Sequence, residues 1–319
     1  MGDGMTIQQF ENSVTVVLVT YRSEHIIGES VSAVARDPAV ARILVVDNAG
    51  GDRSLAVAQS ASPKVETIAN RENLGFGRGM NCGLTRAATP YSLILNPDVM
   101  VGDKDVTTLV SVAEQHPSAA IVGPWWRTQR GLLRKVRTGP TWARETAPYL
   151  PNCDRSVNFL PGAAMLLRNL VFQQLGQFFD PDLFMFGEDD EISHRARSAG
   201  YELIVTTRVE VSHNAGTSSG RDIRIERLRN RHYAWSQLHV QEKFRGAGSA
   251  RWLANSWRRD AWAKCAFYRL LGSPEKLARQ RAVLAGIDDF LAGQRPPVEL
   301  AAYESDCLSG GSTATQRAA

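Results

Sequence analysis

The stretch Leu93-Ile94-Leu95-Asn96-Pro97-Asp98-Val99 places a carboxylate directly after an apolar run. The run predicts a buried strand that ends at Pro97, because proline has no N–H to donate to a sheet ladder. Asp98 is therefore expected at the carboxyl edge of a sheet, where open α/β sheets bind ligands. A carboxylate there can hold a divalent cation that in turn holds a diphosphate. Taken alone, the motif is explained more simply as a turn, since Asn, Pro and Asp are common turn residues.

The composition is that of an ordinary globular protein. The 319 residues, 43% of them hydrophobic and 22% charged, can bury a sizeable core in one large domain or two domains. The four cysteines show no paired spacing, which argues against a disulfide framework or a zinc site. The polar N-terminus lacks a signal core, and no segment has the apolar length of a membrane span. These features predict a reducing, cytoplasmic setting.

The basic charge is concentrated in the C-terminal third. Residues 221–281 contain fifteen Lys and Arg against five Asp and Glu, although the net charge of the chain is only +4. Such a bias indicates an anionic partner. The alternatives are a phosphate-bearing substrate, a membrane surface and nucleic acid.

Strand and helix patterns alternate through the first part of the chain. We expect strands over 14–20, 42–46, 65–69, 91–95 and 119–122, and helices over 24–36, 54–60, 79–88 and 106–115. This alternation predicts βαβ units and a mainly parallel sheet, that is, an α/β fold. Further along, strands are expected over 132–137, 158–167, 202–205 and 209–212, with a helix over 189–198.

Four regions are expected. They are an N-terminal extension (1–13), an α/β domain (14–220), a basic helical region (221–304) and a disordered tail (305–319). The helical region should break near 246–248 and 272–274, where Gly and Pro occur.

Polar residues follow the first two predicted strands. Thr20 and Tyr21 end the first strand, and Asp47 and Asn48 end the second. Asp47 can accept a hydrogen bond from N3–H of uracil or thymine, a donor that cytosine lacks, and Tyr21 can pack on the base. A helix N-cap or turn role for Asp47 is at least as good an explanation of that residue alone.

A glycine-rich stretch, Asn73-Leu74-Gly75-Phe76-Gly77-Arg78-Gly79-Met80-Asn81, follows the third predicted strand. Glycines at this density let a backbone approach a ligand closely. The spacing matches neither the dinucleotide-binding fingerprint nor a P-loop. The alternative is a loop with tight turns and close helix packing.

Two more groups of residues have chemical potential. Four acids, Glu188 to Glu191, follow the aromatic sequence Phe184-Met185-Phe186-Gly187 at a predicted helix start. A carboxylate in a partly apolar pocket can be tuned as a general base, whereas a solvated first turn is the simpler explanation. His213 ends a predicted strand and is a metal ligand or, more simply, a hydrogen-bonded histidine.

Together and in this order, these motifs resemble the inverting, family-two-type glycosyltransferases of the GT-A fold, closest to bacterial rhamnosyltransferases. The matching residues run from about Val14 to Gly220 and are Val19-Thr20-Tyr21, Val45-Val46-Asp47-Asn48, Asn73 through Asn81, Asn96-Pro97-Asp98, Gly162-Ala163, Glu188-Asp189 and Val211-Ser212-His213. The resemblance implies a nucleotide-diphospho-sugar transferase fold with a helical C-terminal extension.

The resemblance also implies a role for each matching residue. Asp98 would bind a divalent cation, Mg²⁺ or Mn²⁺, with His213 completing the site, and Asp189 would be the general base with Glu188 beside it. The nucleotide-binding residues would be Thr20, Tyr21, Asp47, Asn48, Asn73, Gly75, Asn81 and Asn96. Three positions depart from the wider pattern: Asn96 stands where a first Asp often lies, as is usual in this subgroup, Glu191 stands where Asp is common, and Gly50 stands where Ser is common.

The implied reaction moves a sugar, with L-rhamnose from dTDP-rhamnose as the first choice, from a dTDP- or UDP-linked donor. The acceptor would be a cell-surface glycan or a polyprenyl-diphosphate-linked molecule, with no role for nucleic acid. Residues 251–271 form a basic, Trp-rich amphipathic segment in which Leu253, Trp257, Ala261, Cys265 and Tyr268 line one face. That face would either contact the inner surface of the plasma membrane, or pack on the α/β domain or on a second subunit of a homodimer.

Two other classes of function remain open at this stage. A sugar nucleotidyltransferase also places carboxylates at a strand edge, but it usually has a Gly-rich basic loop after its first strand, where this chain has Thr20-Tyr21-Arg22-Ser23. A non-catalytic glycan- or nucleic-acid-binding protein would use the basic segment, but its groove would not suit Asp98, Glu188 and Asp189.

Overall fold

The computed structural model describes residues 7–127, 136–137, 146–147, 153–213 and 223–298. The chain divides into two compact units. The first, here called the sheet unit, consists of Met1–Leu183 and Glu188–Gly220. The second, here called the helical unit, consists of Phe184–Gly187 and Arg221–Ala319.

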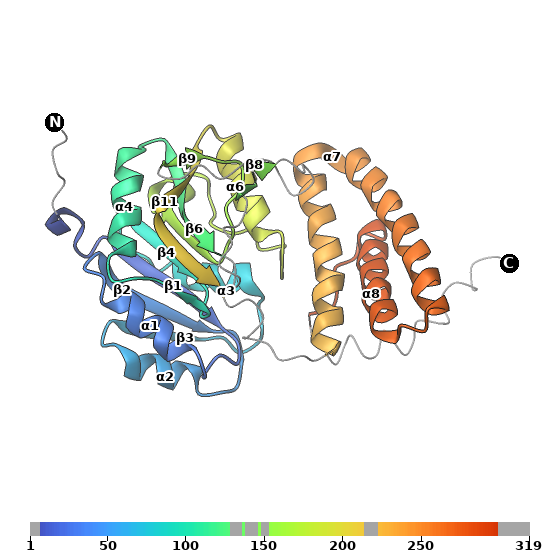
Figure 1. The fold of residues 1–319 in the computed structure, drawn as a ribbon, viewed down its shortest axis with the longest axis horizontal. Helices are drawn as coiled ribbons and strands as arrows, with labels where there is room; N and C mark the ends of the chain where they lie inside the picture. Colours follow the sequence, from blue (N-terminus) through green and yellow to red (C-terminus); the bar gives the residue numbers. More distant parts are fainter. Residues whose placement is uncertain (1–6, 128–135, 138–145, 148–152, 214–222, 299–319) are drawn as a thin grey trace. The chain divides into compact units, whose positions relative to one another are not determined.

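The sheet unit is built on one large mixed sheet with the strand order β3-β2-β1-β4-β10-β6-β11-β5, and β9 pairs with β11 (Figure 1). The strands are β1 (Val14–Thr20), β2 (Val40–Asp47), β3 (Val65–Ala69), β4 (Tyr91–Leu95), β5 (Val99–Met100), β6 (Ala119–Arg127), β9 (Arg155–Ser156), β10 (Ala164–Arg168) and β11 (Glu202–His213). Strands β3, β2, β1 and β4 are parallel, whereas β10 is antiparallel to both β4 and β6. A separate pair is formed by β7 (Val136–Arg137) and β8 (Thr146–Ala147).

Helices cover both faces of the sheet because alternate strand residues point to opposite sides. On one face, Val16 and Leu18 of β1 join a cluster with α1 (Ile27–Ala35), α2 (Ser54–Ala61) and α4 (Asp105–Gln115). On the other face, Val17 and Val19 join a cluster with α3 (Phe76–Leu84), α5 (Asn169–Gln174) and α6 (Glu188–Ser198). A short 3₁₀ helix, η1 (Ile7–Phe10), precedes β1. The predicted α/β class is confirmed.

The strands predicted over 14–20, 65–69 and 91–95 coincide with β1, β3 and β4. The two strands predicted over 202–205 and 209–212 are one strand, β11, whose pairing with β6 shifts register between Thr206 and Glu210. That irregularity separates its two apolar runs in the sequence. The strand predicted over 158–167 is shorter and forms β10, and most of 132–137, like all of the tail 305–319, lies outside the described residues.

The helix predicted over 79–88 begins earlier, at Phe76, so the glycine-rich stretch is largely helical. The glycines of α3 allow it to lie close to β1. A Cβ on Gly83 would lie 2.5 Å from a methyl group of Val17, and one on Gly79 would lie 3.1 Å from Val19. Close helix packing therefore accounts for these two glycines.

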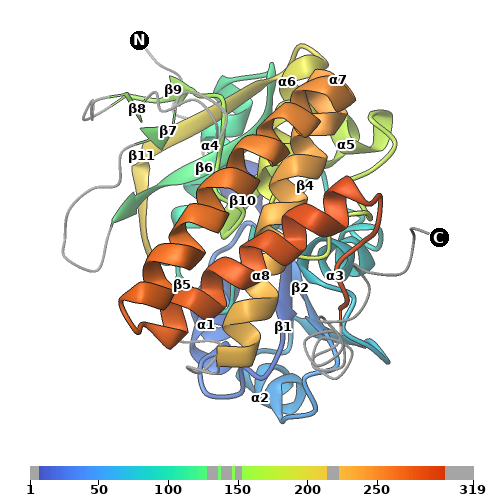
Figure 2. The ribbon, with the colours of Figure 1, turned by 90° about the vertical axis from the view of Figure 1, so that its right-hand side faces the viewer.

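The helices of the helical unit are α7 (Ile223–Leu270) and α8 (Pro274–Leu291), and Figure 2 shows α8 crossing α7 obliquely. Gly246, with φ 81° and ψ 160°, breaks α7 into two arms, as expected from the sequence. Ala234 and Leu238 of the first arm, Ala254 of the second arm and Ile287 of α8 form a common core. Among the described residues, no helix is long and apolar enough to cross a bilayer.

The apolar face predicted over 251–271 is not an external surface. Ala261 and Cys265 are buried against Leu284 of α8, and Leu253 and Trp257 pack on the core around Ile287. The hydrophobic pattern of this face is therefore explained by packing on α8 of the same chain, an alternative that the sequence did not suggest.

A buried aspartate connects α1 with α4. Asp37 is inaccessible to solvent and lies just after α1. Its Oδ2 accepts hydrogen bonds from the N–H groups of Val106 (2.9 Å) and Thr107 (3.1 Å) in the first turn of α4, and its Oδ1 accepts one from Ala39 N–H (3.0 Å). Because Lys104 at the N-cap provides no side-chain hydrogen bond, Asp37 satisfies helix donors that would otherwise be buried without partners.

We predict that Asp37→Ala lowers the free energy of unfolding by about 2–4 kcal/mol, because it leaves several buried N–H groups unsatisfied. Asp103→Ala is the matched control. It removes an aspartate that is 67% exposed and pairs with Arg36 at the surface, so it should cost less than about 1 kcal/mol. Urea denaturation of both variants measures the difference, and equal losses would contradict a capping role for Asp37.

Candidate active site

The carboxyl ends of three parallel strands meet at one edge of the sheet. Thr20, the last residue of β1, pairs with Asp47, the last residue of β2, and Val17 of β1 pairs with Ile94 near the end of β4. The residues that follow these strands, including Tyr21 and Asn96, therefore lie along the same edge, as the sequence predicted. Thr20 itself is fully buried.

The loop after β2 holds the Asp47 carboxylate in place. Asp47 Oδ1 accepts a hydrogen bond from Gly50 N–H (3.2 Å). Burial raises the pKa of Asp47, and the Gly50 bond partly opposes that rise. A Cβ on Gly50 would lie only 2.7 Å from the backbone nitrogen of Arg22, which explains why glycine occupies this position. The Arg22 guanidinium lies 5.3 Å from the centre of the Tyr21 ring.

Asn48 organises the loop that precedes α3. Its Nδ2 donates to Asn73 Oδ1 (2.9 Å) and to the Gly75 carbonyl (2.8 Å). Its Oδ1 accepts from Asn70 Nδ2 and from Leu74 N–H, both at 3.1 Å. The side chain is buried and its hydrogen-bonding capacity is filled, so Asn48 shapes the wall of the site.

Asn81 has a comparable role on α3. Its Nδ2 donates to the Phe179 carbonyl (2.9 Å), and its Oδ1 accepts from Phe179 N–H (3.0 Å). Direct contacts from Asn48, Asn73, Gly75 and Asn81 to a nucleotide stay predictions. What the structure adds is that the three asparagines hold backbone segments around the site.

The stretch Asn96-Pro97-Asp98-Val99 is a β-turn in which Val99 N–H donates to the Asn96 carbonyl (3.1 Å). The turn interpretation and the ligand-binding interpretation are therefore compatible. Val99 begins β5, and β5 pairs antiparallel with β11 so that His213 lies opposite Val99. Strand pairing thus brings the backbone of His213 next to the residue that follows Asp98, although the two positions are far apart in sequence.

This turn has features that suit a cation. Asn96 Oδ1 is buried and has no hydrogen-bond partner within the part of the chain that the structure describes. A carboxylate and an amide oxygen are ligands that Mg²⁺ or Mn²⁺ accept, and an imidazole suits Mn²⁺ better than Mg²⁺. Asp98 and Asn96 therefore offer the kinds of oxygen atom that such a cation accepts.

The candidate base, Asp189, is connected with the same turn through the neighbouring residues Gly162 and Ala163. Asp189 Oδ2 accepts a long hydrogen bond from Gly162 N–H (3.4 Å), and its Oδ1 accepts from Asp190 N–H (3.1 Å). The next residue, Ala163, accepts a hydrogen bond at its carbonyl from Asn96 N–H (2.9 Å). Adjacent residues thus connect Asp189 with the turn that carries Asp98.

Glu188 and Asp189 have different protonation behaviour. Burial, reinforced by the charge of Asp189, raises the pKa of Glu188 to about 8. Its Oε2 atom is buried and accepts no hydrogen bond from the described residues. Near pH 7 Glu188 therefore carries a proton, which makes it a poor candidate for the general base.

Glu191 has a structural role. It is fully buried and forms an ion pair with Arg195 (2.9 Å) one turn later in α6. Arg195 also donates to the carbonyls of Gln177 (2.9 Å) and Phe178. The Glu191–Arg195 pair therefore holds the segment that leads to Asp180. This structural role explains the acid at position 191 without giving it a direct part in the chemistry.

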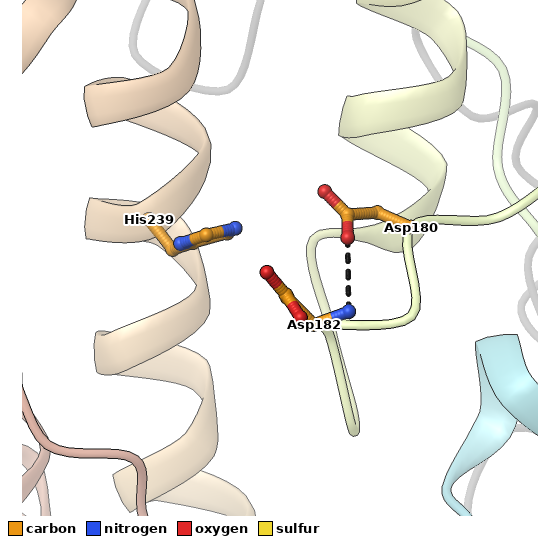
Figure 3. Close-up of side chains that lie close together, drawn as sticks. All are labelled: Asp180, Asp182 and His239. Atoms are coloured by element: carbon orange, nitrogen blue, oxygen red, sulfur yellow. Dashed lines mark hydrogen bonds between the residues drawn. The ribbon is translucent and has the colours of Figure 1, made fainter.

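Our sequence reasoning did not identify Asp180 and Asp182. Asp182 N–H donates to Asp180 Oδ1 (2.9 Å), and Figure 3 shows this bond closing a turn in the sheet unit. The signal was present in the sequence, because Asp180-Pro181-Asp182 has the composition of a turn. His239, also labelled in Figure 3, belongs to α7 of the helical unit.

The segment Phe184–Gly187 belongs to the helical unit although Glu188 returns to the sheet unit. Phe186, with φ 66°, packs edge-on against Tyr233 of α7 at 5.7 Å between ring centres. Ser236 Oγ donates to the Met185 carbonyl (3.0 Å). The residues immediately before the candidate base are thus held by α7.

Residues 15–176 match the model of glycosyl transferase family 2. The chain belongs to this family. It is 29% identical over 211 residues to N-acetylglucosaminyl-diphospho-decaprenol L-rhamnosyltransferase of Mycobacterium tuberculosis, a match that covers 56% of this chain and 68% of the relative.

Two solved structures show the same fold. S. aureus TarS has a TM-score of 0.51 at 15% identity, with 89% of this chain and 93% of TarS covered. The mannosyltransferase PcManGT of Pyrobaculum calidifontis, in complex with GDP-Man and Mn²⁺, has a TM-score of 0.53 at 13% identity, with 89% and 88% covered. The predicted GT-A fold and the predicted enzyme class, a glycosyltransferase that uses a nucleotide sugar, are confirmed.

The raised pKa of Glu188 predicts a pH-dependent loss of stability. Between the ordinary value of 4.5 and about 8, the unfolded chain releases this proton while the folded protein keeps it. The free energy of unfolding should therefore fall as the pH rises from about 5 to 8, by up to about 1.4 kcal/mol per pH unit. Glu188→Gln should remove this fall.

Denaturation of the wild type and of Glu188→Gln at pH 5, 6.5 and 8 measures the effect. Glu72→Gln, a change at an exposed glutamate of the same unit, is the control and should keep the wild-type slope. If Glu188→Gln follows the wild-type slope as well, Glu188 does not retain its proton in the folded protein.

Proposed function

We propose that the protein is an inverting glycosyltransferase that uses Asp189 as its general base. The observation that supports this best is the connection from Asp189 through Gly162 and Ala163 to Asn96. It brings the candidate base together with the strand edge where a nucleotide-diphosphate sugar is expected.

The proposed donor is a dTDP- or UDP-linked sugar. Asp47 offers an acceptor for the N3–H of thymine or uracil, and Tyr21 offers an aromatic face for the base. Our first choice of sugar is L-rhamnose, because the relative from M. tuberculosis is an L-rhamnosyltransferase by name. The proposed acceptor is a cell-surface glycan or a polyprenyl-diphosphate-linked glycan, since that relative's name specifies N-acetylglucosaminyl-diphospho-decaprenol.

A divalent cation, Mg²⁺ or Mn²⁺, is the proposed cofactor, with Asp98 and His213 as its protein ligands and Asn96 Oδ1 close in sequence. The buried, unpartnered Asn96 oxygen supports this assignment. When bound there, the cation would supply positive charge that stabilises the diphosphate leaving group.

The proposed reaction is a single displacement. Gly162 and Asp190 N–H groups orient the Asp189 carboxylate, and the proton on Glu188 keeps a second negative charge away from it. Asp189 takes the proton of the acceptor hydroxyl as that oxygen bonds to the anomeric carbon. The bond from that carbon to the diphosphate breaks, its electron pair stays on the phosphate oxygen, and the anomeric configuration inverts.

We predict that Asp189→Asn lowers the transfer rate at least a thousandfold, because the amide cannot accept the proton. Donor affinity should change less than about threefold, since the substitution preserves the shape of the side chain. Single-turnover transfer and calorimetric titration with the donor measure the two quantities. Asp103→Asn at the exposed surface is the control. Turnover near the wild-type rate would remove Asp189 from the mechanism.

The donor is identified by a thermal-shift panel of dTDP-, UDP- and GDP-sugars, with and without Mg²⁺ or Mn²⁺. A ligand that binds the folded state raises its melting temperature, so dTDP-rhamnose with metal should give the largest rise. Asp98→Ala should abolish the part of that rise which depends on metal. A larger rise with another donor would replace rhamnose, and a metal-dependent rise retained in Asp98→Ala would place the cation elsewhere.

A further inference from the structure

The second arm of α7 carries large apolar side chains on the face opposite to its core. Ala254, Ala261 and Cys265 are buried, as described above. The opposite face, here called the outer face, consists of Trp252, Arg259, Trp262, Phe267 and Leu270. Trp252 is 70% exposed, Trp262 63%, Phe267 55% and Leu270 87%.

These residues form one surface because of their helical spacing. Arg259 follows Trp252 by seven residues and Leu270 follows Arg259 by eleven, which correspond to about two and three turns. Trp262 and Phe267 flank this line on either side. A contiguous set of exposed aromatic and aliphatic side chains indicates an interaction site.

The same segment has an excess of positive charge. Arg258 pairs with Asp288 (3.8 Å) and Lys264 pairs with Asp260 (2.6 Å). Arg251, Arg259 and Arg269 are exposed and form no ion pair with any described residue. Their charges are therefore available to an external anionic surface.

We propose that the outer face binds the surface of an anionic membrane. Tryptophan favours the boundary between lipid headgroups and acyl chains, and arginine can place its guanidinium among lipid phosphates while its alkyl part stays apolar. A helix lying in the membrane plane with Trp, Phe and Leu inserted and Arg around them has this composition. The proposal deepens the proposed function, because a lipid-linked acceptor would be met at such a surface.

A second copy of the chain fits the outer face less well. A symmetric pair would bring Arg259 of one copy towards the same arginine-rich face of the other, and no acid of the outer face would compensate those charges. Burying unpaired like charges is unfavourable, whereas an anionic bilayer neutralises them. Charge complementarity therefore favours lipid.

The test is flotation of the full chain with vesicles of phosphatidylcholine alone and with 30% phosphatidylglycerol. The wild type should bind the anionic vesicles, and the double variant Trp252→Ser/Leu270→Ser should bind them at least tenfold more weakly. Leu170→Ser/Val298→Ser, which removes two exposed apolar side chains elsewhere, is the matched control and should bind like the wild type. Arg251→Gln/Arg259→Gln/Arg269→Gln should lose the preference for anionic vesicles.

Circular dichroism and the donor-induced thermal shift show whether each variant is folded with an intact sheet unit. Failure of the wild type to bind anionic vesicles would overturn the proposal. So would a dimer in sedimentation that Trp252→Ser/Leu270→Ser converts to monomer without affecting vesicle binding. Vesicle binding without any donor-induced shift would instead contradict the proposed function and leave the membrane surface supported.

Discussion

The antiparallel pairing of β10 with β4 is the constraint on which the rest of the site depends. Leu95 pairs with Ala164, so the residues just after β4 lie beside the residues just before β10. The Asn96 N–H therefore meets the Ala163 carbonyl, and Gly162 is left to donate to Asp189. If β10 ran parallel to β4, the carboxyl end of β10 and not its amino end would lie beside the turn. Asp98 would then be separated from the candidate base.

Many side chains of the site form hydrogen bonds or ion pairs with other residues of the chain. Asn48 fills its hydrogen-bonding capacity with the loop before α3, and Asn81 is occupied by the Phe179 backbone. Glu191 and Arg195 hold the segment at Phe178. Such interactions would preorganise the residues proposed to meet the substrate, namely Tyr21, Asp47, Asp98 and Asp189.

The sequence predicted the strands and their polar ends well, because buried parallel strands are continuous apolar runs that stop abruptly. It placed Asp47 at the end of β2 and Asp98 just after β4 for that reason. The partners of Asn48 and Asn81 could not be predicted, because they depend on loop backbone geometry that no local pattern encodes. For the face of α7 formed by Leu253, Trp257, Ala261, Cys265 and Tyr268, the sequence left membrane contact and packing both open. Helical periodicity shows that a face is apolar but cannot tell that its partner is α8.

Two features of the site limit the negative charge that would face a diphosphate. A diphosphate is repelled by carboxylates, and Asp98 and Asp189 both lie near the edge where it is expected. Glu188 adds no charge near pH 7, because burial beside Asp189 keeps it protonated. The unpartnered amide oxygen of Asn96 adds a neutral ligand where a second carboxylate would add charge. The cation proposed at Asp98 would then offset most of the remaining repulsion, so the neutral amide at position 96 and the protonation of Glu188 serve the same electrostatic end.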